Sequence, residues 1–499
     1  MPRIIGIDLG TSNSVVSLYE NGKVKVLSLQ GRTTTPSVLL FDGGKVEVGH
    51  NAKNRMAIVP KKILKSTKRD LGQDVTYNIE GQQITPMMAA SLILKKLKQM
   101  AEEELNDTVN DVVITIPAYF GFKERNETEQ AAINAGLKPI ALLDEPTAAA
   151  ICYAQNRNRE QTFVVVDLGG GTFDVTVLHY YKNGEKFIYD PEVKDGDHYL
   201  GGDDFDNCIV DWLIKEEGAS GFNDKLELKI FAEKAKIDLA SADVADIDCP
   251  FVKTTLSREQ YKRMIQSYLD KICATIKNTV SASGRTLDDI DRYILVGGSC
   301  KHPIVREAVA ECVGKEPYIS PNPDTVVAEG AALYHHMRTL IDLDRPSEGE
   351  VIVRSPKTLG TDVGMDEGIV NAILIHEGDV LPTSVANVAL LYDGQTKLIS
   401  RVCEGDKRAY AENTEIGSVE IDLRYSGNHV VVTVFKLNIS GALSFETYEI
   451  ESDESLIDDL SALFDSKNES LVVDWNMWSN FYEKHKSHIQ MKALPLSIK

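Results

Sequence analysis

Residues 164–177 read VVVDLGGGTFDVTV, a β-branched run that stops at an aspartate and enters a turn of three glycines and a threonine. Apolar and polar residues alternate again after the turn, as they do on a β-strand with one buried face. A similar stretch, IIGIDLGTSNSVVS, occupies residues 4–17. Each copy places an acid at the end of one strand, and glycines or hydroxyls before the next. The duplication predicts two similar lobes that clamp phosphates between them.

Three kinds of glycine-rich turn commonly follow a strand. A dinucleotide-binding fingerprint requires G-x-G-x-x-G at the start of a helix, but the residues after these glycines alternate as in a strand. A P-loop requires G-x-x-x-x-G-K-[ST], which the sequence does not contain. The third kind is a hairpin turn whose glycines let backbone N–H groups approach phosphate oxygens, while strand-end acids hold Mg²⁺ through water.

An ordinary glycine-containing hairpin would explain one such copy equally well. Two copies favour phosphate binding. A third glycine turn, YILVGGSCKHP at residues 293–303, also follows an apolar strand and would close over a nucleoside.

The composition of the 499-residue chain narrows its class. A net charge of −21 argues against nucleic-acid binding, because phosphates require a basic surface. Asp8 interrupts the early apolar run, so we expect no signal peptide. No apolar stretch approaches the about 18 residues of a membrane span. The seven cysteines lack a CxxC pair, which is typical of reduced structural thiols, and we expect a cytoplasmic location.

The length suggests about three domains. Strand and helix signals alternate through residues 1–340, which predicts an α/β architecture. A charged segment with Pro and Gly at residues 341–358 is predicted to be a linker, and short β-rich runs over 359–452 predict a β-sandwich. Residues 453–499 are predicted to form a short helical tail, with helices at DESLIDDLSALF and DWNMWSNFYEKHKSHIQMKA.

The chain resembles the actin, sugar-kinase and heat-shock ATPase superfamily, and within it the DnaK-type 70-kDa heat-shock chaperones. The matching segments, in order, are GIDLGTSNS, RTTTPS, ITIPAYF, DEPTAAA, DLGGGTFDVTV, YLGGDDFDN, AEKAKIDLA, LVGGS and NPDTVVAEGAA. The resemblance is close over residues 3–336 and looser over 350–452. The form EKAKI is similar to bacterial members in particular.

The resemblance implies a two-lobed, actin-like ATPase domain that binds ATP or ADP with Mg²⁺, with K⁺ as a further candidate ion. Asp8 and Asp167 would organise Mg²⁺ and its waters, and Lys68 would position the attacking water. Glu145 would lie near the reaction and relay the nucleotide state, and Thr172 would lie near the γ-phosphate. The other predicted nucleotide contacts are Gly10, Thr11, Ser12, Asn13, Gly169, Gly170, Gly171, Gly201, Gly202, Asp203, Glu233, Lys236, Gly297, Gly298, Ser299, Lys301 and Asp324.

The resemblance also implies that nucleotide state is coupled to binding and release of extended apolar or unfolded peptide. The predicted coupling residues are Pro117, Arg125, Val351, Ile352 and Val353. The predicted peptide-cavity residues are Val363, Val388 and Leu398, although ordinary core positions are an equal interpretation. A J-domain co-chaperone is an implied partner. Whether a nucleotide exchange factor is also a partner stays open, because the chain is shorter than usual between Gly202 and Gly297.

Several positions depart from the family pattern. Lys301 replaces an arginine that stacks on adenine, and Ala240 replaces a serine that touches the nucleoside. Ser400 falls where an apolar cavity residue is expected, and a full lid needs about a hundred residues where only 453–499 follow. These departures support an alternative: a lid-truncated, partner-specific binding protein regulated by nucleotide, with slow or no turnover. A sugar kinase or filament former is a more distant alternative.

Overall fold

A computed structural model describes two compact units. Unit 1 consists of Met1–Tyr119 and Glu127–Val351, and unit 2 of Phe120–Asn126 and Ile352–Lys499. The described residues are 3–28, 31–155, 157–219, 225–249, 252–343, 345, 347, 349–365, 368–391, 396–423, 429–450, 459, 472–486, 489–494 and 497–498.

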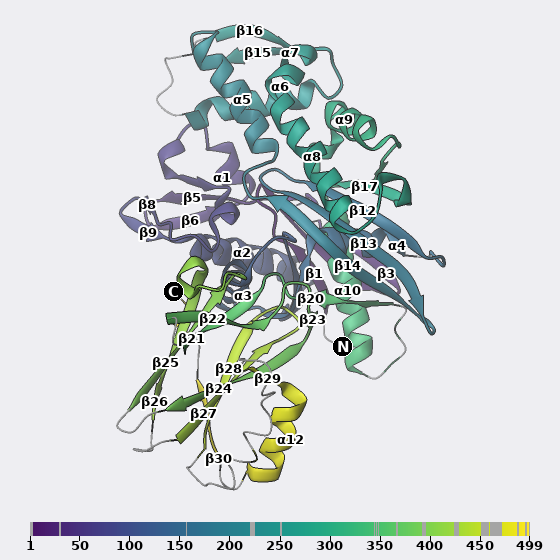
Figure 1. Cartoon of the computed structure of the whole chain (residues 1–499). Helices are drawn as coiled ribbons and strands as arrows, with labels where there is room; N and C mark the ends of the chain where they lie inside the picture. Colours follow the sequence, from purple (N-terminus) through teal and green to yellow (C-terminus); the bar gives the residue numbers. More distant parts are fainter. Residues whose placement is uncertain are drawn as a thin grey trace. The chain divides into compact units, whose positions relative to one another are not determined.

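Unit 1 contains two large sheets with the same connections (Figure 1). In each sheet, a central strand pairs antiparallel with the strand that follows it and parallel with a later one. The first sheet, in spatial order, is β11 (Lys138–Asp144), β10 (Asp111–Ile116), β1 (Ile4–Asp8), β2 (Asn13–Glu20) and β3 (Lys23–Val26), with β4 (Thr35–Pro36) beside β2. The second is β18 (Tyr318–Ile319), β17 (Arg292–Val296), β12 (Gln161–Leu168), β13 (Phe173–Asn183), β14 (Lys186–Asp197) and β19 (Gly349–Val351).

The central strand β12 is buried along its whole length because helices cover both faces of its sheet. Val164 and Val166 belong to a hydrophobic cluster on one face, which also contains residues of α5, α6, α8 and α9. Phe163 and Val165 belong to a second cluster on the other face, with residues of α4 and α10. This two-sided burial explains why the strand reads as an unbroken apolar run up to Asp167.

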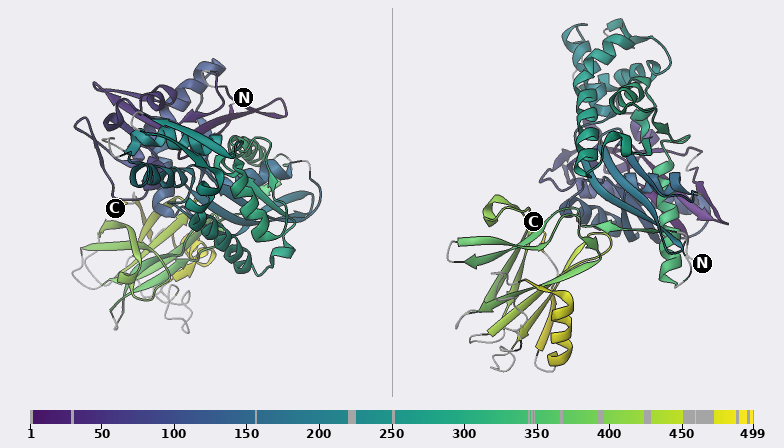
Figure 2. Two further views of the ribbon diagram at one scale, coloured as in Figure 1. Left: turned by 90° about the horizontal axis from the view of Figure 1, so that it is seen from above. Right: turned by 45° about the vertical axis from the view of Figure 1, so that its right-hand side comes forward.

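The helices of unit 1 surround these sheets (Figures 1 and 2). Their bounds are α1 (His50–Asn54), α2 (Pro86–Leu105), α3 (Phe122–Asn134, whose first turn belongs to unit 2), α4 (Glu145–Ala154), α5 (Gly202–Lys215), α6 (Lys225–Asp238), α7 (Arg258–Met264), α8 (Gln266–Ala282), α9 (Pro303–Val313) and α10 (Val326–Asp342). Small sheets complete the unit: β5 (Val38–Asp42), β6 (Lys45–Val48) and β7 (Ile63–Lys65); β8 (Tyr77–Ile79) and β9 (Gln82–Ile84); β15 (Val244–Cys249) and β16 (Val252–Ser257).

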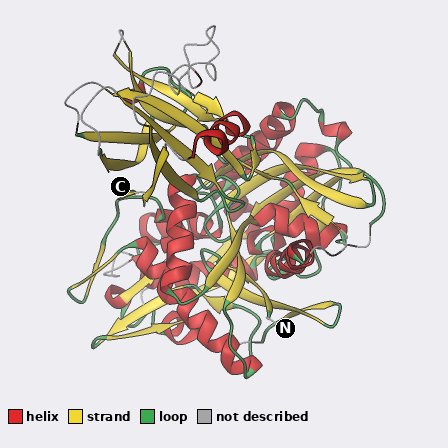
Figure 3. Ribbon diagram, turned by 90° about the horizontal axis from the view of Figure 1, so that it is seen from below, coloured by secondary structure: helices red, strands yellow, loops and turns green. Residues whose placement is uncertain are grey.

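Unit 2 is built mainly of strands (Figure 3). One antiparallel sheet contains β22 (Gly368–Ile375), β21 (Leu359–Met365), β25 (Lys397–Glu404), β26 (Thr414–Asp422) and β31 (Ser497–Ile498). The other contains β29 (Val472–Asp474), β24 (Thr383–Leu391), β27 (His429–Leu437), β28 (Leu443–Ile450) and β30 (Ile489–Leu494). Residues of both sheets share one hydrophobic cluster.

The last part of unit 2 differs from the predicted helical tail. One helix, α12 (Trp475–His485), forms where the second tail helix was predicted, capped by the Asp474 carboxylate. Ile489–Leu494 forms a strand instead of continuing this helix, because it pairs with β28 of the same unit. The first predicted tail helix, at 453–464, lies almost wholly outside the described residues.

The predicted linker, residues 341–358, also contains strands. Val351 ends β19, which extends the second sheet of unit 1 by pairing in parallel with β14. Val353 begins β20 (Val353–Arg354), which pairs with β23 (Val380–Leu381) in unit 2. The apolar island therefore supplies edge strands. None of the helices in the described part of the chain is long and apolar enough to cross a membrane.

Candidate nucleotide site

A cavity of about 430 Å³ opens in unit 1 where the strands of both large sheets end. Residues of all three glycine turns line it, together with side chains from α5, α6 and α10. The predicted residues in its wall are Asp8, Gly10, Thr11, Ser12, Asn13, Lys68, Glu145, Asp167, Gly169, Gly170, Thr172, Gly202, Asp203, Glu233, Lys236, Gly297, Gly298, Ser299, Lys301 and Asp324. Gly171 and Gly201 are not among the lining residues, and a Cβ atom on Gly201 would lie 2.7 Å from the Gly171 backbone nitrogen.

The two repeated turns touch each other at this cavity. A Cβ atom on Gly170 would lie 2.7 Å from the Cβ of Ser12, and one on Gly171 would lie 2.3 Å from Cγ2 of Thr11. Only glycine permits this approach, because any side chain would overlap the opposite turn. The contact brings the backbones of both halves to one side of the cavity, as phosphate binding would require.

Buried carboxyl groups gather at the base of the turns. Asp8 ends β1 and accepts a hydrogen bond from Oγ1 of Thr115 at 3.1 Å. Burial, and secondarily the charge of Glu145, raises its pKa to about 7. The same two causes raise the pKa of Asp167 and of Asp174 well above the ordinary range. Without a cation, these buried carboxyl groups therefore cannot all be ionised at once.

Lys68 supplies positive charge at this acidic site. It lies in the short 3₁₀ segment Thr67–Asp70, is buried, and forms an ion pair with Glu145. The partners are 77 positions apart in the sequence, so only the fold brings them together. A buried ammonium held beside a cavity can neutralise charge that develops on a bound phosphate.

The donor set fits a magnesium ion that is held mainly by water and phosphate. Among the described residues, no group of three or more His, Cys, Asp or Glu side chains could enclose a metal ion. Mg²⁺ commonly binds proteins through one or two carboxylates, with water and substrate phosphates as its other ligands. Asp8 and Asp167, both on the cavity wall, would be those carboxylates.

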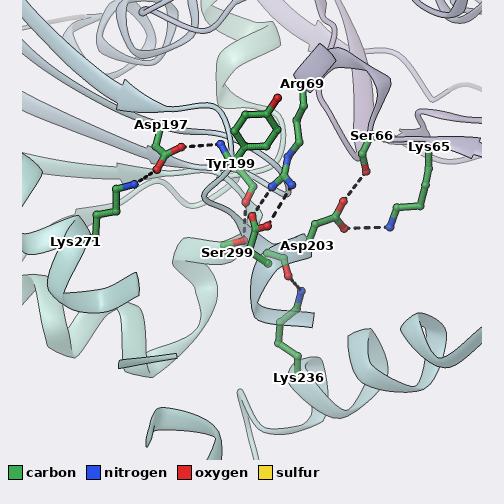
Figure 4. Close-up of polar contacts among 12 residues, drawn as sticks. Lys65, Ser66, Arg69, Asp197, Tyr199, Asp203, Lys236, Lys271 and Ser299 are labelled. Carbon is green, nitrogen blue, oxygen red and sulfur yellow. Dashed lines mark hydrogen bonds and ion pairs between the residues drawn. The ribbon is translucent and has the colours of Figure 1, made fainter. Parts of the chain in front are cut away.

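Ion pairs join β7 and the segment after it to α5 at the cavity (Figure 4), and a further ion pair joins α1 to α6. Asp203 accepts from Ser66 at 2.5 Å and pairs with Lys65 at 3.1 Å. These bonds lower the pKa of the Asp203 carboxyl, although burial opposes them. Glu233, a predicted nucleoside contact, pairs with Lys53 at 2.9 Å.

Residues of the third glycine turn also line the cavity. Ser299 donates to the Gly169 carbonyl oxygen at 2.7 Å, and Lys236 donates to the Gly202 carbonyl oxygen at 2.9 Å (Figure 4). Lys301 forms an ion pair with Asp324. Gly297 has φ of +84°, and a Cβ there would lie 2.6 Å from the Asp167 carboxylate. The turn thus depends on glycine next to the acid cluster.

Some cavity residues were not predicted from the sequence. The set comprises Thr34, Phe205, Asp206, Ile237, Ala240, Tyr261, His302, Pro323 and Val327, of which only Ala240 was noted, as a departure. Helical spacing could have found Asp206, which lies one turn after Asp203 on α5 and pairs with Lys236 at 2.7 Å. Tyr261 carries no local signal, because tertiary packing of α7 alone brings it to the cavity.

The predicted coupling and peptide residues are dispersed. Pro117 is buried in unit 1, whereas Arg125 belongs to unit 2, where it is 2% exposed and donates to the Phe120 carbonyl oxygen at 2.9 Å. Of the peptide residues, Leu398 packs against the cluster shared by both sheets of unit 2, and Val388 belongs to a second cluster around α12. Val363 is buried on β21. Their predicted roles stay predictions.

A protein-family model described as "Hsp70 protein" matches residues 4–79 and 73–493. The match spans nearly the whole chain and includes both repeated turns and the residues that line the cavity. Hsp70 proteins are nucleotide-binding ATPases and ATP-dependent chaperones that bind peptide and interact with co-chaperones. The geometry of unit 1 and this match lead to one conclusion: the chain belongs to the Hsp70 family.

Proposed function

We propose that unit 1 hydrolyses ATP to ADP and phosphate, and that this turnover controls the binding of extended peptide by unit 2. The observation that carries the proposal is the contact between the two glycine turns. They meet beside a cavity that also contains Asp8, Asp167 and Lys68. Phosphoryl transfer to water depends mainly on positioning and charge stabilisation, and this site supplies both.

Each group of cavity residues has a separate role in the proposed reaction. Backbone N–H groups of residues 10–13 and 169–172 bind the phosphates, with the Thr172 hydroxyl near the γ-phosphate. Lys68, held by Glu145, orients the attacking water and neutralises charge on the transferred group. Asp8 and Asp167 would hold Mg²⁺ through water, and the ion would supply positive charge to the bound phosphates. No covalent intermediate is required.

Unit 2 is the proposed peptide-binding part. Two antiparallel sheets whose residues share one hydrophobic cluster support the proposal of a β-sandwich. We propose that Pro117, Arg125 and the apolar residues 351–353 transmit nucleotide state to it. A J-domain co-chaperone would stimulate turnover, and the requirement for an exchange factor stays open.

A narrower substrate range is the second candidate, and a polar pair in unit 2 favours it. Thr361 and Ser400 lie buried with their hydroxyl oxygens 3.3 Å apart, and Thr361 also donates to the Arg401 carbonyl oxygen at 2.8 Å. Ser400 stands two residues from Leu398 on the same strand. Hydroxyls beside a proposed apolar cradle would restrict the peptides it accepts.

ATP turnover tests the first proposal. We expect Lys68→Ala to lower kcat by about 100-fold or more while Mg-ATP still binds, because the lysine acts mainly in the transition state. Lys61→Ala removes an exposed lysine from the preceding 3₁₀ segment and should match the wild type. Retained binding shows that the variant folds. Turnover of Lys68→Ala at the wild-type rate would contradict the proposal.

Peptide binding tests the coupling. The anisotropy of a fluorescent extended apolar peptide should fall faster after addition of Mg-ATP than after Mg-ADP, in both wild type and Lys68→Ala. Only the wild type should then recover the tight state through hydrolysis. Equal release in both nucleotides, or no binding, would favour the partner-specific alternative.

A further inference from the structure

A buried histidine at the nucleoside end of the cavity has no part in the proposed hydrolysis. His302 lines the cavity, yet only 7% of its surface is exposed. It follows the segment Gly298–Lys301 and is the N-cap residue of α9. Its Nδ1 accepts a hydrogen bond from the Ile304 backbone N–H at 3.3 Å.

This bond determines which ring nitrogen carries the proton. A neutral imidazole has one donor and one acceptor nitrogen, so a ring that accepts at Nδ1 carries its hydrogen at Nε2. Burial, with the nearby charges of Arg258 and Lys236, lowers the pKa of His302 to about 4. The ring is therefore neutral at pH 7, and Nε2–H is a hydrogen-bond donor.

The Nε2 atom is buried and has no hydrogen-bond partner among the described residues. The Tyr261 ring packs beside the imidazole, with centroids 5.3 Å apart at an interplanar angle of 60°. The methyl group of Ala240, also on the wall, offers no acceptor. Buried donors in native structures are almost always paired, so an unpaired donor on a cavity wall indicates a partner that enters with a ligand.

Other polar groups at this end already have partners within the protein. Lys301 pairs with Asp324, Lys236 pairs with Asp206, and Ser299 donates to the Gly169 carbonyl oxygen. The third glycine turn, which His302 follows directly, is the turn predicted to close over a nucleoside. In the proposed nucleotide site, His302 is therefore placed near the base of a bound nucleotide.

We propose that His302 recognises the nucleobase, because its Nε2–H donates a hydrogen bond to a ring nitrogen of a bound purine. The proposal rests on the proposed nucleotide site and adds a specificity residue to it. In adenine, N1, N3 and N7 are acceptors, whereas the exocyclic amino group is a donor that Nε2–H would repel. A water molecule that stays on Nε2 when nucleotide binds is the competing outcome.

Deaza analogues of ADP test the bond at the level of single atoms. In 1-deaza-, 3-deaza- and 7-deaza-ADP, a C–H group replaces one ring nitrogen and removes one acceptor. We expect one of the three to bind wild-type protein about five- to tenfold more weakly than ADP, as measured by calorimetry with Mg²⁺ present. This comparison needs no variant.

The variant His302→Asn tests the protein side of the same hydrogen bond. Asparagine is a good N-cap and keeps an acceptor for the Ile304 N–H, but it is too short to place a donor where Nε2 lies. The variant should bind ADP about five- to tenfold more weakly than wild type and bind the discriminating analogue within twofold of ADP. His376→Asn, at an exposed position in unit 2, should leave every affinity unchanged.

Each result decides the proposal. Binding of all three analogues by wild type within twofold of ADP overturns it, as does an undiminished preference for ADP in His302→Asn. Either result leaves the nucleotide site itself intact, because ADP still binds. Failure of wild type and His376→Asn to bind any of these nucleotides overturns the proposed function as well.

Discussion

Asp8 shows how strongly single residues at this site depend on their surroundings. Its carboxyl lies at the end of a buried strand, and its pKa is raised to about 7 chiefly by burial. In the unfolded chain the same group titrates near 4. The folded protein therefore holds the proton more tightly, and it favours protonated Asp8 until a cation approaches.

This difference predicts a pH-dependent stability. The stabilising contribution of Asp8 is fully present below about pH 4 and is lost as the pH rises through about 7, because the folded state binds the extra proton in this interval. We expect Asp8→Asn, without nucleotide or Mg²⁺, to unfold with a free energy about 4 kcal/mol higher than wild type at pH 8 and nearly equal at pH 4, because a pKa raised from 3.8 to about 7 corresponds to about 4 kcal/mol. Urea titrations at both pH values measure the free energies of unfolding of the variant and the wild type. An equal difference between the two proteins at pH 4 and pH 8 would contradict the raised pKa of Asp8.

A second residue-scale prediction concerns a thiol pair on α8 and α9. The Cys312 sulfur lies 3.6 Å from the Cys273 carbonyl oxygen. The Cys273 thiol donates to the Ala308 carbonyl oxygen at 3.6 Å, and this side chain beside Cys312 lowers the pKa of the Cys312 thiol to about 7. We expect iodoacetamide to modify Cys312 first, at a rate that rises through pH 7, because the thiolate is the reactive form.

Replacing Cys273 tests the cause of this reactivity. Cys273→Ala removes the donor and should slow alkylation of Cys312 at pH 6.5 about tenfold. Cys273→Ser keeps a donor and should react nearly as the wild type does. Peptide mass spectrometry resolves the sites. Unchanged reactivity in Cys273→Ala would show that the thiol pair does not lower the pKa.

At the scale of elements, close helix contacts hold the two halves of unit 1 together. Helix α10 packs against β1 and against α4. A Cβ on Gly330 would lie 1.8 Å from the Ala148 carbonyl oxygen, and one on Gly6 would lie 2.3 Å from the Ala332 backbone nitrogen. Glycine is needed here for backbone proximity and not for a special φ angle, because α10 is a regular helix.

Gly330→Ala should therefore destabilise unit 1 strongly. Although alanine favours helices, the added methyl group would meet rigid backbone, and we expect a loss of about 3 kcal/mol in the free energy of unfolding. Gly364→Ala adds the same methyl group into open space and should change stability by less than about 0.5 kcal/mol. Chemical denaturation followed by circular dichroism compares them. A stability of Gly330→Ala equal to wild type would contradict this packing.

At the scale of the whole molecule, each unit has its own hydrophobic core. The clusters around β12 lie in unit 1, and those around β27 lie in unit 2. Units with separate cores can unfold independently. The candidate nucleotide site belongs wholly to unit 1.

Nucleotide should consequently stabilise one unit only. In scanning calorimetry we expect two transitions, with Mg-ADP at 100 times its Kd stabilising unit 1 by about 2.7 kcal/mol and leaving the other transition in place. The transition that Mg-ADP moves is the one that belongs to unit 1, so an isolated fragment is not needed. A single transition that moves as a whole would show that the units unfold together.

Much of the site was predictable because its signals are local. The acid, glycine and hydroxyl pattern is contiguous at both turns, and strand-end positions follow from the alternation of β2 and β13. Local signals also act at α2, where the Thr85 hydroxyl accepts from the Met88 backbone N–H and Pro86 occupies the first helical position. The strands of the tail were not predictable in this way: Ile489–Leu494 continues a helical pattern, but its pairing with β28 prevails.

The duplicated lobes, the two glycine turns and the acids before them could be inferred from local sequence, because each depends on residues that are neighbours in the chain. The distant side chains that complete the site are brought there by tertiary packing. The Lys68–Glu145 ion pair, the Lys53–Glu233 ion pair and the buried imidazole of His302 all depend on packing between separate elements. No local periodicity encodes such contacts, since they form when folded surfaces meet.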